Sequence, residues 1–374
     1  MSLPEGHPLR TRLTDLLGCP TPILQTGMGW VATPELVAGA CNAGAFGFLA
    51  AAALPLAEVE RSIARTRELT DKPFGVNFLM DAPGAEEIVQ MVLENGVRAA
   101  GYNRAPSAEL ITKLKDGGVL CIPTCGAPRH VQKAEKLGAD AVVVQGGEGG
   151  GHTGVIPTSL QISACADAVK IPVVAAGGFK DGRGLVAALA RGAAGIAMGT
   201  RFLMTAESPV PEVTTDRYVK AGLTDVIVTS EIDGLPQRVI VNELVRELES
   251  KNGLARLVFA LRNALELRKI SGASIGELLR SGLTMQKNEK LTRSQMLLAA
   301  NAPMLAKRAM TDGDPVGGYL PSGSVAGVID DRPTCAELVE RIMREAEDAL
   351  GRLQLSEKAS SLQPPHTGSA AADA

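Results

Sequence analysis

The chain has 374 residues, of which 45% are hydrophobic and 3% aromatic, and its formal net charge is −3. This size allows a large buried core, and the near-neutral charge gives no global attraction to nucleic acid or to an anionic membrane. Residues 1–7 lack a basic stretch followed by an apolar one, so we expect a cytoplasmic enzyme. The six cysteines show neither zinc-ligand spacing nor the density of a disulfide framework, and we expect no metal site.

Short apolar runs alternate with helical patterns from residue 20 to about residue 205. Each run is too short for a helix, and most are bounded by glycine or proline. The predicted strands are residues 22–25, 45–49, 74–78, 97–100, 119–122, 141–144, 172–175 and 195–198. Eight such units predict an α/β fold of the (β/α)₈ TIM-barrel type. A Rossmann fold is disfavoured, because Ala32 takes the third glycine position of the G-x-G-x-x-G motif.

Glycines follow the last two predicted strands. In a TIM barrel the active site lies at the carboxyl ends of the strands, and the loops after strands 7 and 8 often bind phosphate. Backbone N–H groups in such loops can converge on a dianion at a helix start. The candidates for phosphate contact are Gly177, Gly178, Gly199 and Thr200. Tight turns would need the same glycines, and Asp181 is expected to be a helix N-cap.

Two amide side chains lie at the ends of other predicted strands, Asn77 on the third and Gln145 on the sixth. Each amide has a donor and an acceptor, which suits the alternating N–H and carbonyl edge of an isoalloxazine and indicates bound FMN. Gly27 and Met28, after the first strand, are expected beside the same cofactor. The simpler alternative is that both amides bind backbone groups at the strand ends.

Residues 145–154, which read QGGEGGGHTG, place a histidine in a glycine-rich loop. Residues without Cβ atoms let the backbone approach a flat ligand closely. His152 is the candidate for proton transfer, because imidazole titrates near neutral pH. The alternative interpretation is a flexible surface loop with a solvated histidine.

The pattern becomes helical beyond residue 235. Residues 254–265 carry an apolar stripe at helical spacing, and Thr334 with Glu337 forms a capping-box signature before a helix over 335–353. These helices are expected to cover the barrel mouth. Basic residues among them could face a phosphate of CoA or NADPH, or could simply be solvated: Lys287, Lys290, Arg293, Lys307 and Arg308.

Three regions follow from these patterns. They are an FMN-binding barrel over 10–235, a helical substrate or lid region over 236–355, and a disordered tail over 356–374 that is rich in Ser, Ala and Pro. We expect a small-molecule substrate, consider NADH or NADPH as a co-substrate, and allow for a homodimer.

Five stretches together resemble the nitronate monooxygenase (2-nitropropane dioxygenase) family of FMN enzymes, which also includes flavin-dependent enoyl reductases and NADH:quinone reductases. In chain order they are P-I-L-Q at 22–25, G-V-N at 75–77, Q-G-G-E-G-G-G-H-T-G at 145–154, A-A-G-G-F-x-D-G-R-G at 175–184 and M-G-T-R-F at 198–202. The resemblance implies that the pyrimidine edge of FMN lies near Asn77 and Gln145, and that Gly150 is close to the flavin. It also implies phosphate contacts from Gly178, Met198, Gly199 and Thr200.

The resemblance predicts a monooxygenase that oxidises alkyl nitronates with O₂, with His152 as base or orienting group. Two departures from the family motifs favour an alternative: residues 26–32 read TGMGWVA where A-P-M-A-G is common, and residues 148–152 read EGGGH where E-A-G-G-H is common. Trp30 adds a large ring on the substrate side. This variant is similar to a subgroup containing reductases of polycyclic acyl-CoA intermediates of steroid ring breakdown.

The alternative function is therefore an NAD(P)H-dependent flavin reductase or dehydrogenase of an enoyl- or polycyclic acyl-CoA. A third interpretation is a barrel that binds a phosphorylated ligand without redox chemistry. It would leave Asn77 and Gln145 without a shared role.

Overall fold

Eight parallel strands close into a barrel in the order β1-β2-β3-β4-β5-β6-β8-β9, and β9 pairs with β1. The structure, a computed structural model, describes residues 4–52, 54–103, 106–250 and 293–361. The barrel strands are β1 Ile23–Gln25, β2 Phe46–Ala50, β3 Gly75–Leu79, β4 Ala99–Asn103, β5 Leu120–Cys125, β6 Val142–Gln145, β8 Val173–Ala176 and β9 Gly195–Met198. The predicted fold class is confirmed. Each strand lies at its predicted place because a parallel strand covered on both faces has a nearly continuous apolar sequence.

Strands β4 and β5 extend furthest beyond their predicted ends, by three residues each. Strand β4 continues to Asn103, which pairs with Leu79 of β3. In β5, Thr124 pairs with Val143 of β6. The predicted ends at 100 and 122 are therefore too early. Polar residues at the carboxyl ends remain in the ladder because their neighbours still offer backbone partners.

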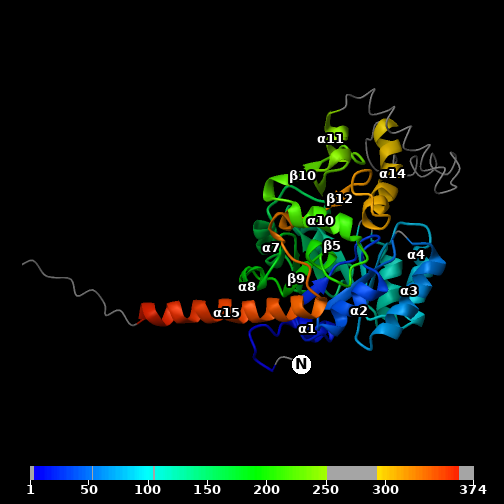
Figure 1. Ribbon diagram of the computed structural model, residues 1–374. Coiled ribbons are helices and arrows are strands. Elements are labelled where there is room, and N and C mark those ends of the chain that lie inside the picture. Colours follow the sequence, from blue (N-terminus) through cyan, green and yellow to red (C-terminus); the bar gives the residue numbers. More distant parts are fainter. Residues whose placement is uncertain (1–3, 53, 104–105, 251–292, 362–374) are drawn as a thin grey trace, which may run out of the picture.

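Helices surround the barrel, one or more after most strands (Figure 1). They are α1 Arg12–Leu17, α2 Pro34–Asn42, α3 Leu56–Leu69, α4 Ala85–Glu94, α5 Ala108–Asp116, α6 Pro128–Lys136, α7 Thr158–Ala166, α8 Gly182–Ala190, α9 Thr200–Leu203 and α10 Glu212–Lys220. Most of them bury an apolar stripe, as α3 does with Val59 and Ile63. The predicted N-cap of α8 is confirmed, since Asp181 Oδ1 accepts the Gly184 N–H at 3.1 Å.

A small antiparallel sheet lies beside the barrel. It consists of β10 Val226–Thr229, β11 Gln237–Ile240, β12 Leu320–Pro321 and β7 Gly151–His152, with β11 pairing the other three. The prediction that only helices follow residue 235 is wrong at β11 and β12, and the β10–β11 hairpin crosses the predicted region boundary. Strands of two to four residues carry too little alternation to be recognised in sequence.

The remaining described elements are η1 Leu223–Asp225, α11 Glu243–Ser250, α14 Arg293–Met310, η2 Ser324–Val328 and α15 Cys335–Ser361. Helix α15 packs on α8 and α2 and then extends away from the barrel (Figure 1). Its predicted capping box is present: the Thr334 N–H donates to Glu337 Oε2 at 2.8 Å, and the Glu337 N–H donates to Thr334 Oγ1 at 3.2 Å. The helix continues past residue 356, where the tail was predicted to begin. No helix in the described part of the chain is long and apolar enough to cross a membrane.

Two sequence predictions lie outside the described residues: the helix at 254–265, and Lys287 with Lys290. Of the other basic residues, Lys307 forms an ion pair with Asp312, and Arg308 with Asp314. Neither pair belongs to the lining of the cavity described below.

Candidate active site

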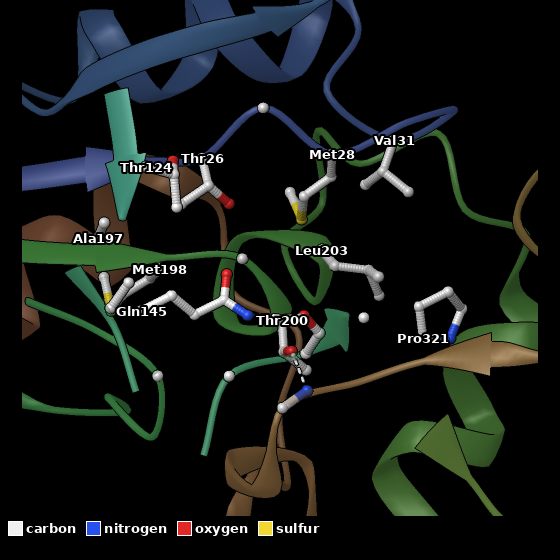
Figure 2. A pocket seen from close by; sticks show the side chains of 18 of the residues that line it. Thr26, Met28, Val31, Thr124, Gln145, Ala197, Met198, Thr200, Leu203 and Pro321 are labelled. Carbon is white, nitrogen blue, oxygen red and sulfur yellow. Dashed lines mark hydrogen bonds between the residues drawn. The ribbon is translucent and has the colours of Figure 1, made fainter. Parts of the chain in front are cut away.

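A cavity of about 520 Å³ opens at the carboxyl ends of the barrel strands (Figure 2). All of the predicted site residues line it: Gly27, Met28, Trp30, Asn77, Gln145, Gly150, His152, Gly177, Gly178, Met198, Gly199 and Thr200. This is the size and position expected for a small-molecule site in a barrel.

The loop after β8 has a backbone shape that favours glycine. Gly177 and Gly178 have φ angles of 106° and 84°, in the left-handed region that other residues rarely adopt. A Cβ atom at Gly177 would lie 2.7 Å from the backbone nitrogen of Gly149, so the loops after β6 and β8 meet backbone to backbone. At Gly199, a Cβ atom would lie 3.1 Å from Thr26 Oγ1. The two loops predicted to bind phosphate thus present backbone atoms to the cavity and leave little room for side chains.

The two amides have different surroundings. Asn77 packs against glycine, because a Cβ atom at Gly27 would lie 2.5 Å from the Asn77 Cβ atom. Gln145 Nε2 donates to the carbonyl of His152 at 2.8 Å and to that of Gly150 at 3.3 Å. The alternative that Gln145 binds backbone therefore holds for its nitrogen, and its Oε1 is the atom it can offer to a ligand.

His152 forms a close pair with an acid that the sequence did not indicate. Its Nε2 lies 2.7 Å from Asp233 Oδ2. The His152 side chain is 57% exposed, whereas the Asp233 side chain is 9% exposed. The two residues are 81 positions apart and meet only because β7 pairs with β11, so no local sequence signal could have found Asp233.

The segment at the start of η2 also forms part of the site. The Gly323 N–H donates to Thr200 Oγ1 at 2.9 Å, the bond drawn in Figure 2. The Ser324 N–H donates to the carbonyl of Glu148 at 3.0 Å. A Cβ atom at Gly150 would lie 2.7 Å from the Gly323 nitrogen, so this segment packs directly on the glycine-rich loop. This segment carries no sequence signal of a site, because glycine and serine between elements usually indicate an ordinary turn.

Bulky apolar side chains line the side of the cavity formed by the C-terminal part. Helix α14 contributes Pro303, Ala306 and Met310, and Tyr319 lies next to β12. Trp30 joins this wall from the loop after β1, and its Nε1 donates to the Pro303 carbonyl at 3.1 Å. Trp30 also has a φ of 66°, rare for a bulky residue and a source of local strain. Helix α14 thus lies at the cavity, as expected of a region covering the barrel mouth.

One buried cation lies in the lining. Arg201 is 1% exposed, and its Nη2 donates to Asp331 Oδ1 at 2.6 Å. Asp331 Oδ2 in turn accepts from Arg341 of α15 at 2.7 Å. Burial lowers the pKa of the Arg201 guanidinium, and the charge of Asp331 opposes this shift. Through Asp331, the ion pairs therefore connect α9 to α15.

Asn103 and Thr124 also line the cavity and were not predicted. They lie on β4 and β5 beyond the apolar runs, so the early predicted strand ends placed them in loops. A rule that extends each barrel strand to the next polar residue would have found both.

A parallel barrel with a glycine-lined cavity, uncharged amides and one histidine at its strand ends has the architecture of a cofactor-dependent barrel enzyme. The family model described as nitronate monooxygenase matches residues 10–345, and the chain belongs to that family. It is therefore a flavin-dependent oxidoreductase, as predicted.

The chain has relatives with two kinds of name. A protein of Rhodococcus jostii (strain RHA1), named (3aS,4S,5R,7aS)-5-hydroxy-7a-methyl-1-oxo-octahydro-1H-indene-4-carboxyl-CoA dehydrogenase, is 50% identical over 92% of this chain and 99% of its own. A probable nitronate monooxygenase of Staphylococcus saprophyticus is 33% identical over 64% of this chain and 81% of its own. Among solved structures, FabK from Thermotoga maritima is 32% identical with a TM-score of 0.75, covering 93% of this chain and 99% of its own.

Proposed function

We propose that the protein is an FMN-dependent oxidoreductase acting on the CoA thioester of a fused-ring carboxylic acid. The observation that carries this proposal is a single cavity with two unlike walls: glycine backbone and amides on the barrel side, and bulky apolar side chains on the other. A flat cofactor with a phosphate suits the first wall, and an apolar ring system suits the second. The Rhodococcus relative supports the substrate class, because the alignment covers nearly the whole of both chains.

The barrel wall fits FMN residue by residue. Gly178, Gly199 and Thr200 would hold the phosphate through backbone N–H groups, since left-handed glycine and short side chains keep the backbone accessible. Asn77 and Gln145 Oε1 would face the polar edge of the isoalloxazine. Gly27, Met28, Gly150, Gly177 and Met198 would surround it. Bound FMN supplies the two-electron redox chemistry.

His152 would act as the base that takes a proton from the substrate. A C–H bond next to a thioester carbonyl is acidic because the negative charge left by deprotonation spreads onto the carbonyl oxygen, and a nitro group acts in the same way. A base at the cavity is thus useful for a thioester substrate, whereas an alkyl nitronate has already lost this proton. The single histidine in the lining is His152, and Asp233 can stabilise its protonated form.

Oxidation of an alkyl nitronate with O₂ is the second candidate. The family match and the Staphylococcus relative support it. If the enzyme reduces the thioester rather than oxidising it, NADH or NADPH would be the electron donor.

Anaerobic stopped-flow absorbance would distinguish these functions. The purified protein should be yellow and carry about one noncovalent FMN per chain. It would be mixed with a hydroindane carboxyl-CoA thioester, propyl nitronate, NADH or NADPH, and loss of flavin absorbance followed. We expect the thioester to bleach the flavin at least tenfold faster than propyl nitronate. Bleaching by propyl nitronate alone would favour the second candidate, and a colourless folded protein that takes up no FMN would contradict both.

His152→Ala tests the proton role. We expect the variant to keep FMN and to lose about 10²-fold or more in turnover, as is typical for removal of a general acid or base. His130→Ala is the matched control, because His130 is exposed on α6 away from the cavity. Full activity of His152→Ala would remove His152 from the chemistry.

A further inference from the structure

Asp233 lies at the centre of a set of hydrogen-bond donors. Its Oδ1 accepts the Leu235 N–H at 3.0 Å, and its Oδ2 accepts from Gln237 Nε2 as well as facing His152 Nε2. Gln237 is 2% exposed and Asp233 is 7% exposed. Asp233 therefore has several hydrogen-bond donors and little water around it, which suits a carboxylate, because a carboxylate only accepts hydrogen bonds.

Strand pairing and hydrogen bonds hold the backbone on both sides of His152 in place. In the β7–β11 register, Gln237 lies opposite His152 and Arg238 lies opposite Gly151. The Thr153 N–H donates to the Pro236 carbonyl at 3.1 Å, and Arg238 Nη2 donates to the Gly147 carbonyl at 2.6 Å. The pairing of β7 with β11 thus aligns the imidazole with Asp233.

We propose, on the basis of the proposed function, that Asp233 is a positioning residue that keeps the His152 proton on Nε2, so that Nδ1 takes the substrate proton. The carboxylate can only accept, so the Nε2 atom 2.7 Å away must carry the hydrogen. Neutral imidazole has one N–H, which leaves the lone pair on Nδ1. When Nδ1 gains the proton, Asp233 stabilises the resulting imidazolium.

Other charged and titratable groups near the pair have defined roles. Burial, followed by the charge of Asp233, raises the pKa of the Tyr319 hydroxyl, which stays neutral. Glu148 Oε2 accepts the Thr158 N–H at 2.7 Å. Burial lowers the pKa of Arg238, and the charge of Glu148 opposes this shift. Asp233 is therefore the group that sets the state of His152 through a direct bond.

The first test is Asp233→Asn. Its amide can donate to Nε2 and so favours the tautomer with the proton on Nδ1. We expect FMN content and KM to be nearly unchanged and kcat to fall about tenfold or more. We also expect the pH profile of kcat/KM to change, because the imidazole loses its carboxylate partner. Asp225→Asn is the control, since Asp225 Oδ2 accepts the exposed Gly222 N–H away from the site.

The second test does not depend on activity. With ¹⁵N-labelled histidine, long-range ¹H–¹⁵N NMR of the wild-type protein reports which ring nitrogen carries the hydrogen, and His152→Ala identifies the signals. We expect Nε2–H. A wild-type His152 with Nδ1–H would overturn the proposal, as would an Asp233→Asn variant with wild-type kcat and pH profile. Inactivity toward every thioester would instead refute the proposed function and leave the tautomer result standing.

Discussion

The two walls of the cavity are built on different physical principles. On the barrel wall, Gly177 and Gly178 adopt left-handed backbone angles, and Gly27 packs on Asn77 with no room for a Cβ atom. On the opposite wall, Trp30 and Met310 present large apolar side chains. Backbone geometry shapes the first wall and side-chain volume shapes the second. Substitutions should therefore separate cofactor binding from substrate binding.

The largest effect is expected on the barrel wall, from Gly178→Val. Gly178 has a φ of 84°, which a β-branched residue adopts only with strain, and a Cβ atom there would lie 3.3 Å from the Glu148 Cβ atom. We expect the purified variant to lose its FMN and with it essentially all activity. Flavin absorbance per chain measures the effect.

Gly126→Val is the matched control for this prediction. Gly126 also follows a barrel strand, but a Cβ atom there would have no neighbour within 4 Å. This variant should retain FMN. Unchanged flavin affinity in both variants would show that the phosphate lies elsewhere.

A smaller effect is expected on the apolar wall, from Trp30→Ala. The change removes a large ring and the hydrogen bond to Pro303. We expect FMN to stay bound while KM for the thioester rises at least tenfold, which corresponds to about 1.4 kcal/mol. Trp30→Phe keeps an aromatic ring and should lie between the two. Loss of FMN in Trp30→Ala would contradict the separation of the walls.

The smallest effect is expected outside both walls, from Asp331→Asn. Burial alone would raise the pKa of Asp331, but its hydrogen bond to Arg341 and the charges of Arg201 and Arg341 lower it. The loss in free energy of unfolding should be about 1 kcal/mol, below that of a fully buried pair because Asp331 is about one third exposed.

The pH dependence of this loss follows from the sign of the shift. Because the pKa of Asp331 is lower in the folded state, its stabilising contribution is present above the ordinary pKa of an aspartate, near about 4. It disappears as the pH falls through the lowered value. Urea unfolding of both proteins should show the full difference at pH 7 and a progressively smaller one as the pH is lowered below about 4. An equal difference at every pH would mean that the ion pair is not its cause.

The sequence by itself determined the barrel strands and the glycines of the barrel wall that line the cavity. Parallel strands buried on both faces must be nearly continuous apolar runs, so the strand at Val173–Ala176 was recognisable from composition alone. Glycine at 177 and 178 indicated exposed backbone after this strand, because few other residues adopt such angles. These features depend on residues close together in the chain.

Only the tertiary structure decided the partners of the histidine loop. Asp233 lies beside His152 because the two-residue strand β7, which contains His152, pairs with β11. Gly323 binds Thr200, which is 123 positions away in the sequence. Neither contact can be recognised from a local sequence pattern, because a hydrogen bond between distant segments requires only that the two lie close together in the folded chain. The same reason explains why Asn103 and Thr124 were missed: their place in the ladder depends on neighbouring strands, not on their own hydrophobicity.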